Sequence, residues 1–281
     1  MKKRSEFLDT ILEYNPNYDI DLIAHAYDVA EEMHRGQLRK SGEPYLIHPM
    51  AVAEILADLG MDEETIVAGL LHDVVEDTSY TEEELIVDFG EDVAMLVDGV
   101  TKLASLKFES KEERQAENLR KMFLAMSKDI RVLIIKLSDR LHNLRTINYM
   151  THDKIIEKCR ETLDIYAPLA HRLGVYTIKW VLEDLSLRYL DPEGFYELVR
   201  LVGMKREERE RMIADVSAQL SAKLREFGIR AEITGRPKHF YSIYKKMKNQ
   251  NKTFDQINDL IAIRVLVNTQ QDCYFVLGVV H

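Results

Sequence analysis

The sequence contains few cysteines and no long apolar run. Only two of its 281 residues are cysteine, Cys159 and Cys273, so neither a disulfide framework nor a CxxC metal module is expected. No apolar segment approaches the roughly 20 residues that a helix needs to cross a bilayer. The charged N-terminus also lacks the apolar segment of a signal peptide. We therefore predict a protein of the reducing cytoplasm that does not contact a membrane.

The sequence also has fewer basic than acidic side chains. With 48 acidic against 38 basic side chains, the net charge of −10 argues against non-specific binding to nucleic acid. A nucleotide substrate remains compatible with this charge, because a bound metal ion and local lysines or arginines can invert the field at a site. The length suffices for about two domains.

Helical periodicity dominates the first two-thirds of the chain. The acidic segment 62–64 begins a predicted helix that continues through His72 and Asp73. Thr81 and Glu84 have the spacing of a capping box at the start of a further helix. This part of the sequence therefore predicts an all-helical domain.

The pattern changes near residue 205. A long amphipathic helix is predicted over residues 206–227, and residues 229–233 alternate like a strand. The β-branched run 260–267 predicts a buried strand. Between the strands, residues 236–252 carry six lysines or arginines and no acid, with aromatic residues interleaved, which favours polyphosphate binding over a merely solvated helix face. The predicted fold class is mainly α, followed by the start of an α/β domain.

One set of side chains indicates a metal site. His48, the adjacent pair His72 and Asp73, and Asp139 offer two imidazoles and two carboxylates on a helical background. Such a set suits a divalent ion that keeps water positions open. The alternative, a group of solvated surface acids, fits poorly with the apolar residues that flank His72 and Asp73, because buried carboxylates need partners.

Further polar residues stand close to this set in the sequence. Glu76 and Asp77 follow within one helical turn and are placed to orient or deprotonate a water, although they could also be a solvated helix end. Arg39, Lys40 and Ser41 form a compact cationic loop suited to gripping phosphate, although a plain polar turn has the same composition.

Longer motifs connect these residues to a known family. The sequence resembles the long Rel/SpoT stringent-response enzymes, which make and degrade the alarmone (p)ppGpp. The resemblance covers nearly the whole chain and is carried by HRGQLRKSGEPYLIHP (34–49), GLLHDVVEDT (69–78), VDGVTKL (97–103), IKLSDRLHNLRT (135–146), APLAHRLG (167–174) and GRPKHFYSIYKKM (235–247).

The resemblance implies an HD-type hydrolase domain over residues 1–155, a helical connector over 156–200 and a truncated synthetase domain over 201–281. It implies that Mn²⁺ is held by His48, His72, Asp73 and Asp139, and that Glu76 and Asp77 activate water. The nucleotide contacts that it implies in the hydrolase domain fall on Arg39, Lys40, Ser41, Asn143 and Thr146.

In the synthetase part, the resemblance implies one Mg²⁺ ligand, Asp259. The family's second catalytic carboxylate and its guanine-stacking tyrosine fall beyond residue 281, so we expect this chain not to synthesise (p)ppGpp. The regions through which the family contacts the ribosome are also absent from the chain. The implied ATP contacts fall on Arg236, Lys238, His239, Ser242 and Lys246.

The expected function is therefore metal-dependent hydrolysis of the 3′-pyrophosphate of (p)ppGpp, with (p)ppGpp, GDP, GTP and ATP as small-molecule partners. Two alternatives stay open from the sequence: a general HD phosphohydrolase acting on other nucleotides, and a non-catalytic guanine-nucleotide sensor. The metal identity and the formation of homo-oligomers also stay open, because two histidines and two aspartates accept Fe²⁺, Co²⁺ or Zn²⁺ as well as Mn²⁺.

Overall fold

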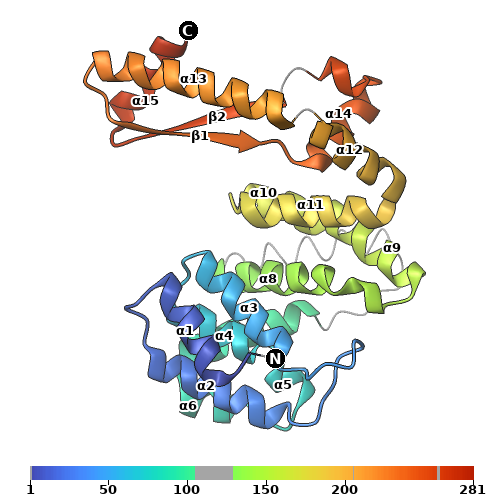
Figure 1. The fold of residues 1–281 in the computed structure, drawn as a ribbon. Coiled ribbons are helices and arrows are strands. Elements are labelled where there is room, and N and C mark those ends of the chain that lie inside the picture. Colours follow the sequence, from blue (N-terminus) through green and yellow to red (C-terminus); the bar gives the residue numbers. More distant parts are fainter. Residues whose placement is uncertain (1, 105–128, 205, 258–259) are drawn as a thin grey trace. The chain divides into compact units, whose positions relative to one another are not determined.

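The computed structural model confirms the predicted mainly helical fold. The chain divides into two compact units, Met1–Ser186 and Leu187–His281 (Figure 1). In the described part of the first unit, helices are joined by loops with one isolated bridge, between Leu38 and Pro44. The structure describes residues 2–104, 129–204, 206–257 and 260–281.

The first unit consists of a series of helices and short helical turns. The described elements are α1 Arg4–Tyr14, α2 Ile20–Met33, α3 Ile47–Asp58, α4 Glu63–Leu71, α5 Val74–Asp77, α6 Glu82–Ala104, α8 Arg131–Arg145, the 3₁₀ turn η1 Ile147–Tyr149, α9 His152–Glu161, the π-helical turn η2 Thr162–Tyr166, α10 Ala167–Arg172 and α11 Tyr176–Leu190, whose last residues lie beyond Ser186.

The second unit adds a small sheet to its helices. Its elements are α12 Pro192–Met204, α13 Arg206–Glu226, β1 Ala231–Pro237, α14 Phe240–Gln250, the 3₁₀ turn η3 Phe254–Gln256, β2 Ile261–Val267 and α15 Gln270–Val280. None of the helices that the structure describes has the length and apolar character required to cross a membrane.

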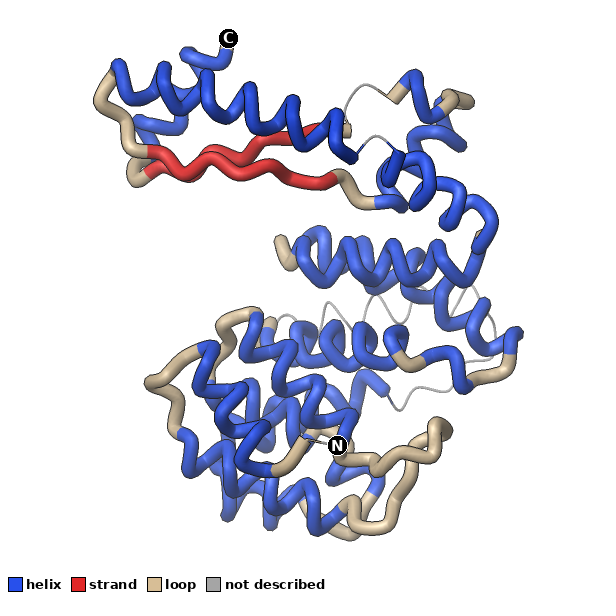
Figure 2. The backbone as a smooth tube through the Cα atoms, viewed as in Figure 1, coloured by secondary structure: helices blue, strands red, loops and turns tan. Residues whose placement is uncertain are grey.

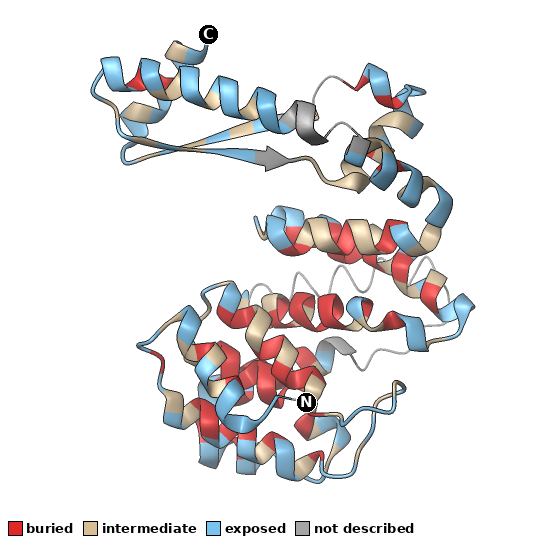
Figure 3. Cartoon of the chain, in the orientation of Figure 1, coloured by how far each residue is buried: buried red, intermediate tan, exposed pale blue. Residues whose placement is uncertain are grey.

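Helix α4 lies at the centre of the first unit. Every residue from Thr65 to Leu71 is buried, and α4 packs against α2, α3, α6 and α8 (Figure 3). A helix that is apolar on all sides is stable only inside a core. Its N-terminus is capped by Asp62, whose carboxylate accepts a hydrogen bond of 2.9 Å from the Thr65 amide. The residue that follows α4 is therefore delivered into the interior of the unit.

Gly69 allows α3 and α4 to approach closely. A Cβ atom at this position would overlap the Cδ1 atom of Leu56, a fully buried residue of α3. The close approach matters because α3 and α4 each contribute to the polar cluster described below.

One local prediction for α6 is confirmed. The Thr81 amide donates to the Glu84 carboxylate at 2.8 Å, and the Glu84 amide donates to the Thr81 hydroxyl at 3.2 Å, which is the predicted capping box. At Gly90 the backbone has a φ of 88°, and the helical path breaks there before continuing to Ala104.

In the second unit, β1 and β2 pair antiparallel, from Ala231 opposite Val267 to Pro237 opposite Ile261 (Figure 2). Helix α13 packs on both strands, and α15 packs on β2. The prediction that residues 260–267 form a strand is confirmed, but the prediction that this strand is buried is wrong. Leu266 is 50% exposed, because a sheet of two strands leaves a face of β2 uncovered.

The predicted domain limits near residues 155 and 200 stay a prediction.

We predict that Gly69→Ala destabilises the first unit by about 1–3 kcal/mol, because the added methyl group overpacks the α3–α4 contact. Urea unfolding followed by circular dichroism measures this change. In a Leu56→Ala background the same substitution should cost clearly less, because the clashing side chain has been removed. Strictly additive effects of the two substitutions would contradict this account of the contact.

Candidate functional site

Three of the four predicted metal ligands form one buried cluster. His48 lies in the first turn of α3, His72 directly follows α4, and Asp139 lies in the second half of α8. Their ligand atoms all lie within 4.8 Å of one another, and all three side chains are buried. Residues 91 positions apart in the sequence thus meet because α3, α4 and α8 pack together.

Asp73 reaches the same cluster from its edge. Its Oδ2 lies 3.2 Å from Nε2 of His72 and 3.7 Å from Nε2 of His48, and its side chain is 21% exposed. The His48 Nε2 atom also lies 3.4 Å from Oδ1 of Asp139. The four predicted ligands are therefore brought together, with Asp73 on the solvent side.

The prediction that one helix carries both His72 and Asp73 is wrong. Helix α4 ends at Leu71, His72 occupies its C-cap position, and Asp73 is the N-cap residue of the short helix α5. The chain turns between the two helices, and this turn lets adjacent residues both face the cluster, which consecutive positions on one straight helix do not do.

The imidazole of His72 is prepared to bind a cation. Its Nδ1 atom donates to the backbone carbonyl of Gly69 at 2.8 Å, so Nε2 carries the lone pair whenever the ring is neutral. Among the described residues this buried Nε2 atom makes no hydrogen bond, and its ionic neighbour is Oδ2 of Asp73 at 3.2 Å. A buried nitrogen that faces two carboxylates and makes no hydrogen bond fits a metal ligand.

The charged side chains of the cluster shift one another's pKa values. Burial lowers the pKa of His72, but the carboxylate of Asp73 raises it, to about 9 overall. Burial raises the pKa of Asp139, but Lys136 and His48 outweigh it and hold this pKa well below its ordinary value. The carboxylates therefore stay ionised, and a cation among them is favoured.

Lys136 and Asn143 hold the carboxylate of Asp139. The ammonium group of Lys136 donates to Oδ2 at 2.8 Å, and the side-chain amide of Asn143 donates to Oδ1. These residues lie three positions before and four after Asp139, the spacing that places side chains on one helix face. Sequence reasoning assigned no role to Lys136, although its spacing from Asp139 was a usable signal.

Tyr45 is a second residue that sequence reasoning missed. Its hydroxyl donates to Oδ2 of Asp73 at 2.6 Å and lies 3.3 Å from Oδ2 of Asp77. Burial and the Asp73 charge raise the pKa of Tyr45, so the phenol stays protonated and remains a donor. Tyr45 thus links a predicted metal ligand to a predicted catalytic acid.

Glu76 and Asp77 lie on α5, beside the cluster and exposed to solvent. Desolvation and the charges of Asp73 and Asp77 raise the pKa of Glu76 above its ordinary value. A carboxylate with a raised pKa is the better proton acceptor near neutral pH. Their placement suits the predicted roles, which stay a prediction.

Four of the five predicted nucleotide contacts line one cavity, and the fifth, Asn143, contacts Arg39. The Nη1 atom of Arg39 lies 3.0 Å from Nδ1 of His142. The Nη2 atom of Arg39 donates to Oδ1 of Asn143 at 2.9 Å and to Oγ1 of Thr146 at 3.4 Å. The cavity has a volume of about 240 Å³. It is lined by Leu38, Arg39, Lys40, Ser41, Tyr45, Thr146, Tyr149 and Met150.

His142 connects this cavity to the metal cluster. Its Nδ1 atom lies 2.7 Å from Nδ1 of His48 as well as near Arg39. Burial and the neighbouring His48 and Arg39 lower the pKa of His142 to about 3, so the ring is neutral. The sequence places His142 on the polar face of its helix, three residues after Asp139, but it did not predict a role for this side chain.

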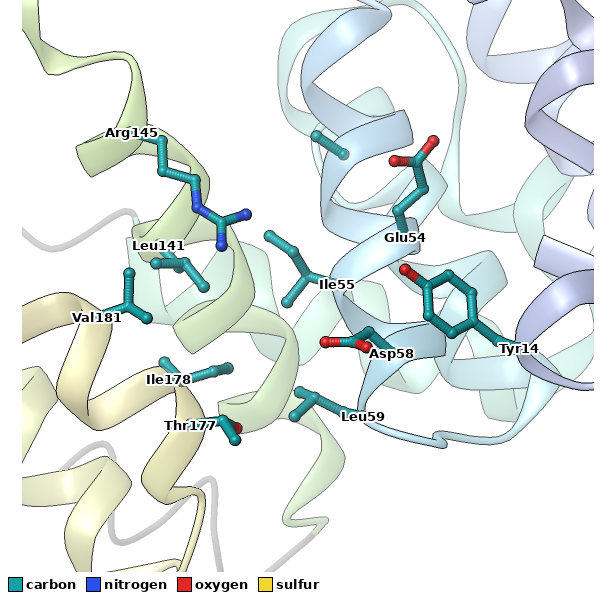
Figure 4. Close-up of a pocket in the computed structure, with 11 residues that line it drawn as sticks. Tyr14, Glu54, Ile55, Asp58, Leu59, Leu141, Arg145, Thr177, Ile178 and Val181 are labelled. Carbon is teal, nitrogen blue, oxygen red and sulfur yellow. The ribbon is translucent and has the colours of Figure 1, made fainter. Parts of the chain in front are cut away.

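A second cavity, of about 320 Å³, lies elsewhere in the first unit, among α1, α3, α8 and α11. Figure 4 shows Arg145 extending from α8 toward Ile55 of α3, with Glu54, Asp58 and Tyr14 on the far side. None of the residues that line this cavity is one of the predicted site residues.

The predicted ATP contacts lie near the start of α14. Lys238 and His239 precede this helix, and Ser242 and Lys246 lie on it, one turn apart. Arg236 belongs to β1. Asp259, the predicted Mg²⁺ ligand, lies outside the described residues. The roles of these residues stay a prediction.

Comparison with known proteins identifies two regions. A family described as "HD domain" matches residues 26–176, and a family described as "Region found in RelA / SpoT proteins" matches residues 235–281. The first region contains the buried cluster and the adjacent cavity.

Several curated proteins are similar over nearly the whole chain. A "GTP pyrophosphokinase" from Myxococcus xanthus is 52% identical over 97% of this chain and 36% of its own length. A "Guanosine-3′,5′-bis(diphosphate) 3′-pyrophosphohydrolase" from Haemophilus influenzae is 50% identical over 90% of the chain and 37% of its own length. "Bifunctional (p)ppGpp synthase/hydrolase SpoT" from Escherichia coli is 47% identical over 98% of the chain and 40% of its own length. The chain thus spans between about one third and two fifths of these relatives.

The buried cluster predicts one divalent ion per chain. Titration with Mn²⁺ in a calorimeter should show a single site. His72→Ala should weaken the binding by at least about 10–100-fold, because it removes one of the two imidazoles of the cluster. His171→Ala, which removes an exposed histidine of α10, serves as the matched control and should bind like the wild type. Equal affinity of the His72→Ala protein would show that the ion binds elsewhere.

Proposed function

This chain belongs to the HD-domain family and carries the RelA/SpoT region, and we propose that it hydrolyses the 3′-pyrophosphate of (p)ppGpp to GDP or GTP and pyrophosphate. The observation that carries the proposal is the buried cluster of His48, His72 and Asp139 beside a cavity bordered by Arg39 and Lys40. A cation-binding cluster next to a cationic cavity is suited to a phosphorylated substrate. Relatives named for this hydrolysis support the same choice.

The metal that the family implies fits the residues present. His48, His72, Asp73 and Asp139 would hold it, and the buried Nε2 atom of His72, which makes no hydrogen bond among the described residues, supports this assignment. When bound, a divalent cation supplies Lewis acidity to phosphate oxygens and makes water more acidic. We propose Mn²⁺ as the cation, although the donor set also accepts Fe²⁺, Co²⁺ and Zn²⁺.

The protein's own groups then have separable tasks. Arg39 and Lys40 neutralise phosphate charge, while Ser41, Asn143 and Thr146 contact the nucleoside (contacts suggested by the shared cavity and by the hydrogen bonds to Arg39). Bidentate guanidinium groups suit phosphate well.

Proton transfer is assigned to α5. Glu76 and Asp77 orient a water, and Glu76 accepts its proton, which the raised pKa of Glu76 favours. The water oxygen forms a bond to the phosphorus attached to O3′, and the O3′–P bond breaks. O3′ takes up a proton, so the products are a nucleotide with a free 3′-hydroxyl and pyrophosphate. Tyr45 keeps Asp73 and Asp77 in place through its hydroxyl.

We also propose that residues 235–281 belong to a second activity, the transfer of pyrophosphate from ATP to GDP or GTP with Mg²⁺. Arg236, Lys238, His239, Ser242 and Lys246 would contact ATP. With Asp259 as the one predicted carboxylate ligand, these 281 residues should not perform the transfer, because phosphoryl transfer needs a clamped metal ion. Formation of ppGpp from ATP and GDP by the purified chain would refute this proposal.

We predict that Asp73→Ala lowers (p)ppGpp turnover by more than about 100-fold, because it removes both a ligand and the partner of Tyr45. Release of pyrophosphate and GDP from ppGpp with Mn²⁺ measures turnover, and circular dichroism checks the fold. Asp58→Ala, which removes an exposed carboxylate of α3, should retain wild-type turnover.

The products also separate the proposal from its alternatives. Release of triphosphate or monophosphate from other nucleotides, with ppGpp left intact, would indicate a general phosphohydrolase. Tight ppGpp binding without products would indicate a sensor.

A further inference from the structure

One ring nitrogen of His142 contacts two other side chains. Its Nδ1 lies 3.0 Å from Nη1 of Arg39 and 2.7 Å from Nδ1 of His48. The ring is buried on α8, three residues after Asp139. One atom thus stands between the cationic loop that borders the cavity and a predicted metal ligand.

The donor groups around His142 determine which ring nitrogen of His142 and of His48 carries a proton. A guanidinium group can only donate, so Nδ1 of His142 must accept from Arg39 and carry no proton. Since the same lone pair faces His48, the Nδ1 atom of His48 must be the donor in the 2.7 Å contact. The lone pair of the neutral His48 ring is then on Nε2, the atom that faces Asp73 and Asp139.

We propose that His142 is a positioning residue that selects the metal-binding tautomer of His48, and that Arg39 enforces this selection through His142. The proposal rests on the proposed metal site. It gives the two histidine ligands equivalent arrangements, because the carbonyl of Gly69 does for His72 what Nδ1 of His142 does for His48. It also couples the loop that would bind phosphate to the cluster that would bind the cation.

A hydrogen-bond acceptor at position 142 and a side chain that only fills space there respond differently to substitution. If His142 only filled space on α8, an apolar side chain of similar size would replace it without effect on the cluster. If it is an acceptor, asparagine should replace it, because the Oδ1 atom of asparagine occupies nearly the place of Nδ1 and also accepts. Leucine should not.

The test compares His142→Leu, His142→Asn and Arg39→Met, with His171→Leu as the control for loss of a histidine outside the cluster. Mn²⁺ affinity is measured by calorimetry without substrate. The tautomer of His48 is read from the ¹⁵N shifts of its ring in the metal-free protein. Circular dichroism and thermal melting verify that each variant is folded.

We expect His142→Leu to weaken Mn²⁺ binding about 10–100-fold, the usual effect of losing a group that orients a ligand. His142→Asn should recover most of this loss. Arg39→Met should also weaken binding, although Arg39 is not one of the proposed ligands, and should add little to His142→Leu. The wild-type His48 ring should carry its proton on Nδ1, and the Leu variant should show a mixture of tautomers.

Wild-type affinity in His142→Leu, or equal losses in the Leu and Asn variants, would overturn the proposal. If His142→Leu does not fold, Arg39→Met and His142→Asn still decide, because the proposal requires weakened binding in the first and near-normal binding in the second. None of these readouts requires turnover, so failure of the proposed hydrolysis and failure of this proposal can be told apart.

Discussion

The first unit depends on one costly feature, the burial of an ionised carboxylate, Asp139, in the middle of a helical core. Removing a carboxylate from water is tolerated only where other groups replace its hydration. Lys136 and Asn143 supply hydrogen bonds from the same helix, and His48 approaches from α3. Loss of one partner of a buried ion pair typically costs about 3–5 kcal/mol, so this carboxylate constrains how α8 and α3 face one another.

The remaining predicted ligands are positioned by the apolar core. Helix α4 is buried on all sides, which places its C-cap residue, His72, beside Asp139 rather than at the surface. The turn into α5 then directs Asp73 to the rim and leaves Glu76 exposed. One break in the helical path therefore separates a buried, predicted metal ligand from solvent-accessible acids, an arrangement suited to water-dependent chemistry.

Much of this could be predicted from the sequence, for identifiable reasons. The helical class, the capping box at Thr81 and the strand over residues 260–267 follow from local patterns, and the structure confirms them. The break at His72 could not be predicted, because apolar periodicity runs through it. The contacts of Tyr45 and His142 could not be predicted for another reason: they join residues 28 and 94 positions apart, and local spacing carries no information about such contacts.

If the buried cluster binds a divalent metal ion, anomalous diffraction from crystals of the chain grown with Mn²⁺ should locate it there. We expect one strong peak at roughly 2.0–2.2 Å from Nε2 of His48, Nε2 of His72 and a carboxylate oxygen of Asp139, with Asp73 completing the set. The absence of a peak at the cluster at saturating Mn²⁺ would contradict the metal site, and so would an ion bound only by surface carboxylates.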